Sequence, residues 1–151
     1  MKFKNLYESL KWHWASLNID INIGVSEASL KSFEAKYELA LPEDFRSYFL
    51  CVNGMPPQDV DDEMFRFWML EEVKPLSHCA TEYANPTYIQ NPESLFLFAD
   101  YSMWGHAYAI RLTNTLESNK IFIIGYEPPI SIFDSFSEFV DAYLTNKDLL
   151  F

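Results

Sequence analysis

The chain contains 151 residues, 17% of them aromatic, which predicts one domain over residues 1–151 with a well-filled core and excludes a disordered chain. Its 22 acidic and 11 basic residues give a formal net charge of −11, so we expect a surface that attracts basic proteins and binds no nucleic acid directly. Two Cys exclude a disulfide framework, and four Gly argue against a Gly-rich phosphate loop. With no secretion signal and no run of about 18 apolar residues, we expect a cytoplasmic protein with no membrane partner.

The first third of the chain has the pattern of three helices. Apolar residues recur at helical spacing over Phe3–Leu17 and predict an amphipathic first helix. Ser26 is a typical N-cap and predicts the start of a second helix, which we expect to end at Leu41 because the following proline disfavours helical backbone there. Pro42 suits the first position of a third helix, and Gly54 suits the left-handed residue that stops one.

The rest of the chain predicts a sheet and a closing helix. We expect strands at Met64–Leu70, Leu95–Asp100, Ala107–Leu112 and Ile121–Tyr126. Between the first two, Pro75–Pro92 predicts a long irregular segment with a short helical turn near residues 81–84, and Pro128-Pro129 ends the last strand. Ser135 and Glu138 form a capping box that opens the last helix. Helices followed by a mainly antiparallel sheet and a closing helix predict an α+β fold.

Four blocks of this pattern, over residues 25–144, resemble the SMI1/KNR4 family, the SUKH superfamily of bacterial immunity and fungal regulatory proteins. They are the helix pair from Gly24-Val25-Ser26-Glu27 to Asn53-Gly54, the segment Phe67–Val73, the hairpin Leu95–Asp100 with Tyr108–Leu112, and the helix at Ser135–Phe139. Trp104-Gly105-His106 and Arg111 depart from the residues usual in the family. The resemblance implies a protein that binds and blocks a cognate polymorphic toxin, often a nuclease. The alternative is an intracellular regulatory or scaffolding domain.

No catalytic or metal-binding motif occurs in the sequence. The cluster from Asp59 to Glu63 lacks the ligand spacing of a calcium loop, and His78-Cys79 lacks the second pair that a zinc site needs. Cys51 or Cys79 would need a histidine base beside it to act as a nucleophile, and nothing in the sequence places one there. We therefore expect a protein that is not an enzyme and holds no cofactor or metal.

Two segments are candidates for binding a partner. Between Asp59 and Glu72 there are six acidic residues against Arg66, which suits a basic protein, although a solvated loop would have the same composition. The expected hairpin turn Tyr101–His106 gathers aromatic side chains of the kind that anchor interfaces, although Trp104 could instead fold back onto the core. The predicted partner-binding residues are Asp59, Asp61, Asp62, Glu63, Tyr101, Trp104 and His106.

Overall fold

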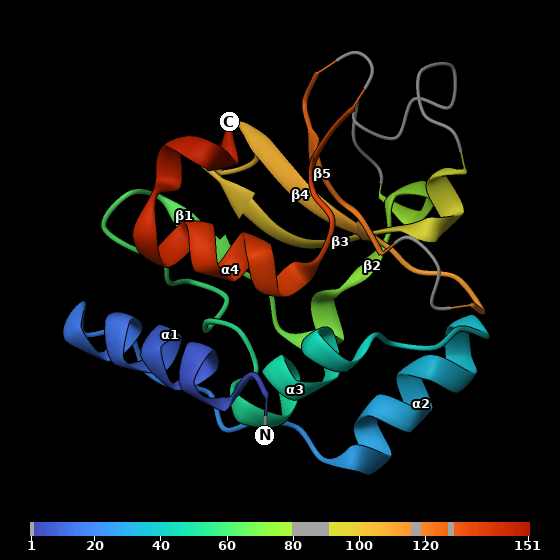
Figure 1. Cartoon of the computed structure of the whole chain (residues 1–151), viewed down its shortest axis with the longest axis horizontal. Coiled ribbons are helices and arrows are strands. Elements are labelled where there is room, and N and C mark those ends of the chain that lie inside the picture. The colour runs from blue at the N-terminus through green and yellow to red at the C-terminus, as the bar shows by residue number, and fades with distance from the viewer. Residues whose placement is uncertain (1, 80–90, 116–118, 127–128) are drawn as a thin grey trace.

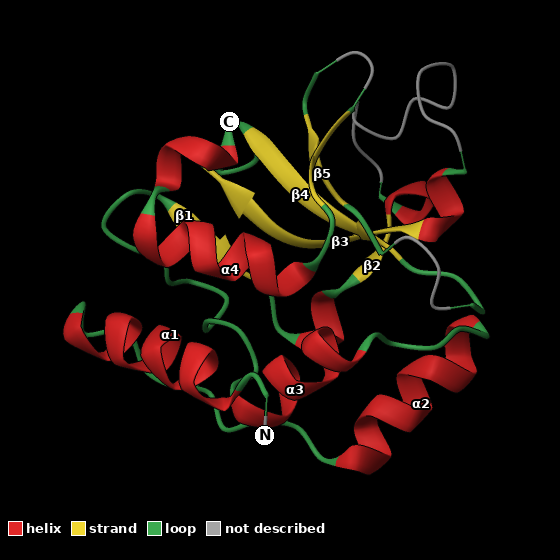
Figure 2. Ribbon diagram, viewed as in Figure 1, coloured by secondary structure: helices red, strands yellow, loops and turns green. Residues whose placement is uncertain are grey.

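A computed structural model describes residues 2–79, 91–115, 119–126 and 129–151, and within them it shows four α-helices and one antiparallel sheet (Figure 1). The helices are α1 (Lys4–Ser16), α2 (Glu27–Tyr37), α3 (Glu43–Cys51) and α4 (Phe136–Thr145). The strands in the described residues are β1 (Phe65–Phe67), β2 (Lys74–Pro75), β3 (Leu95–Tyr101), β4 (His106–Arg111), β5 (Ile121–Ile124) and β6 (Ile130–Phe133). Their order is β1-β3-β4-β5-β6, with β2 also paired to β3, so the predicted α+β architecture is confirmed (Figure 2).

Local signals in the sequence set some helix ends but not others. The Ser26 Oγ accepts a hydrogen bond from the Ser29 amide at 3.1 Å, which confirms the predicted N-cap of α2. α2 ends before the proline can act, because Glu38 adopts a left-handed conformation with a φ of 53°. The expectation that Gly54 stops α3 is wrong: Val52 ends that helix in an extended conformation. Gly54, with a φ of 60°, is instead needed where the chain passes the Trp68 carbonyl, because a Cβ there would lie 2.4 Å from its oxygen.

The strands follow the predicted order, with two additions, β2 and β6. β1 is shorter than predicted, because Met64 has a φ of 73° and cannot continue a strand. The last predicted strand, β5, ends at Ile124, before the two prolines, but a further strand, β6, begins directly after Pro129, and its Ser131 pairs with Phe122 of β5. Prolines prevent pairing only at their own positions, which explains why this short edge strand escaped prediction. The helical turn expected near residues 81–84 lies outside the described residues.

Aromatic side chains join α4 to the sheet. The ring of Phe139 lies 5.1 Å from those of Phe98 and Tyr108, measured between centroids, and 5.8 Å from that of Phe67. One helical turn earlier, Phe136 lies 4.8 Å from Phe45 of α3. Such pairs contribute about 0.5–1.5 kcal/mol each beyond the burial of their area. They hold α4 in place over the face of the sheet.

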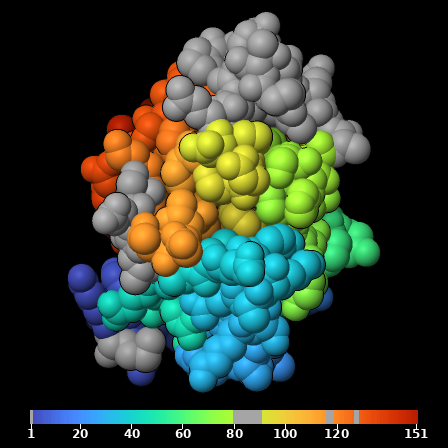
Figure 3. All heavy atoms as spheres, turned by 90° about the vertical axis from the view of Figure 1, so that its right-hand side faces the viewer, coloured from blue at the N-terminus to red at the C-terminus, as the bar shows by residue number. Residues whose placement is uncertain are grey.

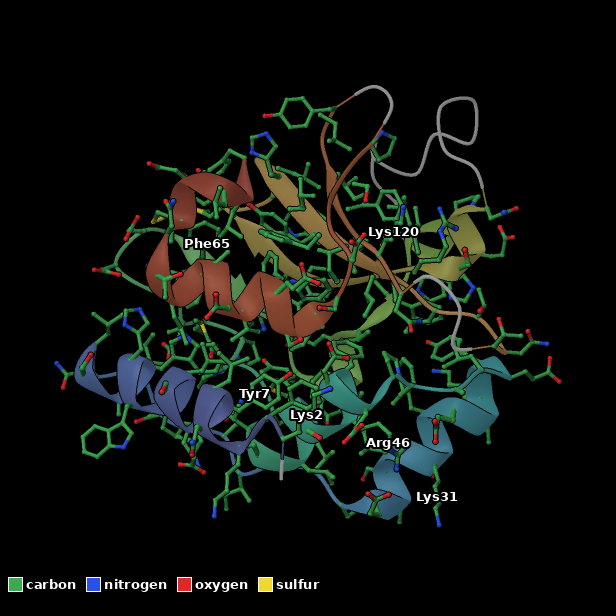
Figure 4. The ribbon with its side chains drawn as sticks, in the orientation of Figure 1. Lys2, Tyr7, Lys31, Arg46, Phe65 and Lys120 are labelled. Carbon is green, nitrogen blue, oxygen red and sulfur yellow. The ribbon has the colours of Figure 1, made fainter. Side chains whose placement is uncertain are left out.

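The remaining helices attach to this layer in two ways. α1 packs beside α3 and α4, and the Tyr7 hydroxyl donates to the Asp44 carbonyl at 2.7 Å (Figure 4). α2 is tied to α3 by Arg46, which forms ion pairs with Glu27 and, at 2.8 Å, with Glu34. Figure 3 shows the molecule turned by 90°. In this view α2 lies below the segment that ends at residue 79 and the segment that begins at residue 91.

Candidate protein-binding surface

The acidic loop, residues 59–63, runs from the end of α3 toward β1 and is organised by one of its own carboxylates. The Asp61 Oδ1 accepts hydrogen bonds from the amides of Glu63 and Phe65, both at 2.8 Å. The Asp61 amide in turn donates to the Phe65 carbonyl at 2.9 Å. As a result Asp61 is only 4% exposed, whereas Asp62 and Glu63 are exposed and Asp59 is half-buried.

A second set of contacts connects Asp61 to two helices. The Tyr143 hydroxyl on α4 donates to the Asp61 Oδ2, and the Trp14 Nε1 on α1 donates to the Tyr143 oxygen at 3.2 Å. Burial, and next the charge of Asp61, raise the pKa of Tyr143 well above its usual range, so the phenol stays a neutral donor. Asp61 therefore anchors the loop to the fold, and we remove it from the residues expected to face a partner.

His13 on α1 brings a ring nitrogen close to the same loop. One ligand atom each from His13, Asp61 and Asp62 lie within 4.8 Å of one another, a set that could hold a metal ion. The Asp61 carboxylate, however, already accepts two amide hydrogen bonds and one from Tyr143. The His13 ring packs edge-on against the Tyr143 ring at 5.7 Å. The hydrogen bonds of Asp61 are explained by the fold, and we assign Asp61 and Tyr143 to holding the loop.

Beside the acidic loop lies a cluster of four rings, Tyr101, His106, Tyr126 and Phe151, here called the aromatic end. The Phe151 ring lies 4.9 Å from that of Tyr101 and 5.9 Å from that of His106, and the Tyr126 ring stacks on His106 at 5.2 Å. Tyr101 and His106 pair across β3 and β4, directly before and after the hairpin turn. Phe151 is 50% exposed and Tyr126 is 41% exposed, so the cluster presents ring surface to solvent.

Two contacts join the acidic loop to the aromatic end. The Ser102 amide donates to the Met64 carbonyl at 2.9 Å. The Lys147 Nζ, in the short helix η5 (Lys147–Leu150) that precedes Phe151, lies 3.3 Å from the Glu63 Oε1. Exposed carboxylates and exposed rings are thus neighbours on one surface, drawn from four segments far apart in the sequence.

The turn between β3 and β4 contains three successive residues with left-handed backbone. Ser102, Met103 and Trp104 have φ values of 54°, 53° and 74°. None of them is Gly, and such conformations concentrate at functional sites because they cost energy that the surroundings must offset. The turn leaves the Met103 side chain 77% exposed next to the aromatic end.

Trp104 does not join this surface. Its ring lies 5.1 Å from that of Trp68, and the side chain is half-buried. The Trp68 Nε1 donates to the buried Asp100 Oδ2 at 2.7 Å, and burial raises the pKa of that carboxyl against the lowering effect of this hydrogen bond. In the sheet Asp100 pairs with Arg66, which lies between Phe65 and Phe67. Because the rings of Phe65 and Phe67 face α4, Asp100 and the Trp104 ring beside it lie on the opposite face of the sheet. Of the two alternatives for Trp104, the structure shows the one in which it folds back onto the body.

The sequence singles out Tyr101 and His106 but not Tyr126 and Phe151. Tyr126 lies at the end of a predicted strand, and Phe151 follows Leu149-Leu150 after the last predicted helix. An aromatic residue outside a periodic apolar stripe is the signal in the sequence that could have found both, because such a residue has no place in the predicted core.

The comparison with known families agrees with this fold. The model of the SMI1 / KNR4 family (SUKH-1) matches residues 24–142. This chain belongs to the SMI1/KNR4 family. The match includes the acidic loop, Tyr101, His106 and Tyr126 of this SMI1/KNR4 protein, whereas α1, η5 and Phe151 lie outside it. No curated protein sequence matches the chain. Among the residues that the structure describes, no helix has the length and apolar character needed to cross a membrane.

Proposed function

We propose that this chain is a non-catalytic protein-binding module that captures a basic protein, and that the partner is a toxin domain of the kind implied by its resemblance to SUKH immunity proteins. The observation that carries the proposal is the contact between the acidic loop and the aromatic end. Exposed carboxylates beside exposed rings suit a basic protein surface with apolar anchor points.

In this mechanism the carboxylates of the acidic loop and the rings of the aromatic end act on different steps of binding. Asp59, Asp62 and Glu63, on a chain with a net charge of −11, attract a basic partner from a distance and raise the rate of encounter. Tyr126 and Phe151 lose their exposed ring surface once the partner docks, which slows dissociation. The toxin is blocked because the bound chain covers its basic substrate-binding face.

The first test is to look next to this gene for a secreted protein with a C-terminal toxin domain and to co-express that domain with the chain. We expect the chain to restore growth and to co-purify with that domain. If neither a complex nor rescue is seen, the toxin assignment is wrong, and a complex without rescue would favour a scaffolding domain.

Substitutions then separate the effect of the carboxylates on association from the effect of the rings on dissociation. We expect the variant D62N/E63Q to lower the association rate about fivefold at low salt and to flatten its salt dependence, measured by surface plasmon resonance. Tyr126→Ser should mainly raise the dissociation rate. The matched control is D20N/E38Q, which removes two exposed charges outside the acidic loop. Equal effects of D62N/E63Q and D20N/E38Q would contradict a role for the acidic loop.

A further inference from the structure

A second surface feature lies along α1 and α4, which pack side by side (Figure 1). Between them runs a depression of about 510 Å³, here called the α1–α4 groove. Its apolar lining comes from Phe3 before α1, Leu6 of α1, Phe133 of β6 and Leu149 of η5. The first three are half-buried, and Leu149 is 54% exposed. The groove thus offers apolar surface that the fold itself leaves partly uncovered.

The charges around the groove are mainly negative. Glu138 and Asp141, one turn apart on α4, line it and are exposed. Asp134 and Asp148 are exposed next to the lining residues Phe133 and Leu149 in the sequence. Among the described lining residues the one cation is Lys2, whose Nζ lies over the Phe3 ring at 5.3 Å. This charge pattern is complementary to a basic occupant.

The shape of the groove indicates what kind of segment fits. Most of its lining consists of side chains from helices, whose backbone groups already bond within each helix, so an occupant gains affinity through side chains. The ten residues of α4 span roughly 15 Å, which corresponds to about three helical turns of a partner. A helix with apolar residues on one face and Lys or Arg on the flanks matches both the lining and the rim.

We propose that the α1–α4 groove binds a basic amphipathic helix of a partner protein. This inference rests on the proposed protein-binding function and adds a second contact surface, distinct from the acidic loop and the aromatic end. It assigns to Leu6 and Leu149 the apolar contacts and to Glu138 and Asp141 the pairing with basic side chains.

The test uses a fluorescein-labelled synthetic peptide of Leu and Lys, about 14 residues long and arranged as an amphipathic helix, and measures fluorescence anisotropy. We expect D141K to weaken binding roughly tenfold and L149S to weaken it by a smaller factor. The matched control E38K makes the same charge change at the end of α2 and should change the affinity less than about twofold. Two-dimensional NMR should place the shift changes on the start of α1 and on α4.

Three results would overturn the groove proposal: equal weakening by D141K and E38K, equal binding of a peptide with the same composition in shuffled order, or shift changes centred on residues 59–63. Tyr126→Ser, which tests the proposed function, should leave peptide binding unchanged. If the peptide does not bind while the toxin domain is still captured, the groove proposal fails and the proposed function stands. If the peptide binds and no toxin domain does, the proposed function fails alone.

Discussion

Asp61 and Asp62 are neighbours in the sequence with opposite surroundings in the structure. Asp61 accepts hydrogen bonds from two amides and from the Tyr143 hydroxyl, so its carboxylate is bound by groups of the protein itself. Asp62 is exposed to solvent. At the scale of single residues, identical side chains therefore divide into a structural role for Asp61 and a proposed binding role for Asp62, and burial separates the two.

This division can be measured by substituting each residue with Ala. Asp61→Ala leaves two amides and a phenol without their acceptor, and we expect the free energy of unfolding to fall by about 3 kcal/mol. Asp62→Ala should change it by less than about 0.5 kcal/mol. Urea denaturation followed by Trp fluorescence gives both values. Similar losses for the two variants would show that Asp61 does not anchor the loop.

Among the elements, α4 contacts the sheet, the acidic loop and the α1–α4 groove. Its inner face packs on the sheet through Phe136 and Phe139, Tyr143 holds the acidic loop, and its outer side lines the α1–α4 groove. Its start is capped by the Ser135 Oγ, which accepts from the Glu138 amide at 3.3 Å. The predicted capping box is modified, because the Glu138 carboxylate accepts from the Ser135 hydroxyl at 3.0 Å. Because α4 contributes to both proposed surfaces, a shift of its first residue would change both.

Removing this cap should loosen α4 measurably. We expect Ser135→Ala to lower the free energy of unfolding by about 1 kcal/mol, because the Glu138 amide loses its acceptor. Ser32→Ala, at an exposed position inside α2, is the control and should be neutral or slightly stabilising, since Ala is the better helix former. Thermal unfolding by circular dichroism compares the two. A Ser135→Ala variant as stable as the control would mean that α4 is held by packing alone.

For the whole molecule, negative charge remains after its ion pairs are formed. Arg46 pairs with Glu27 and Glu34, Arg66 pairs with Glu72, and Lys147 pairs with Glu63. These cations are thereby engaged with acids of the chain itself, and the net charge of −11 is left to act on the surroundings. The compact state concentrates this charge, so self-repulsion opposes folding, and the same charge would attract the basic partner proposed above.

Salt should therefore stabilise this protein. Raising sodium chloride from about 0.01 M to about 0.5 M shortens the screening length several-fold, and we expect the melting temperature to rise by a few degrees. The variant D59N/D62N carries less charge and should show a smaller rise. Differential scanning calorimetry at several salt concentrations checks this, and a melting temperature that stays flat or falls would contradict it.

The sequence by itself determined the helices, four of the six strands in the described residues and the family resemblance, because apolar periodicity, caps and turns act within a few neighbouring residues. It also singled out Tyr101 and His106 beside an acidic segment. Only the tertiary structure decided that Asp61 turns inward, that Trp104 packs on Trp68, and that Tyr126 and Phe151 complete the aromatic end. Burial and clustering depend on contacts between segments far apart in the chain, and no local pattern records those contacts.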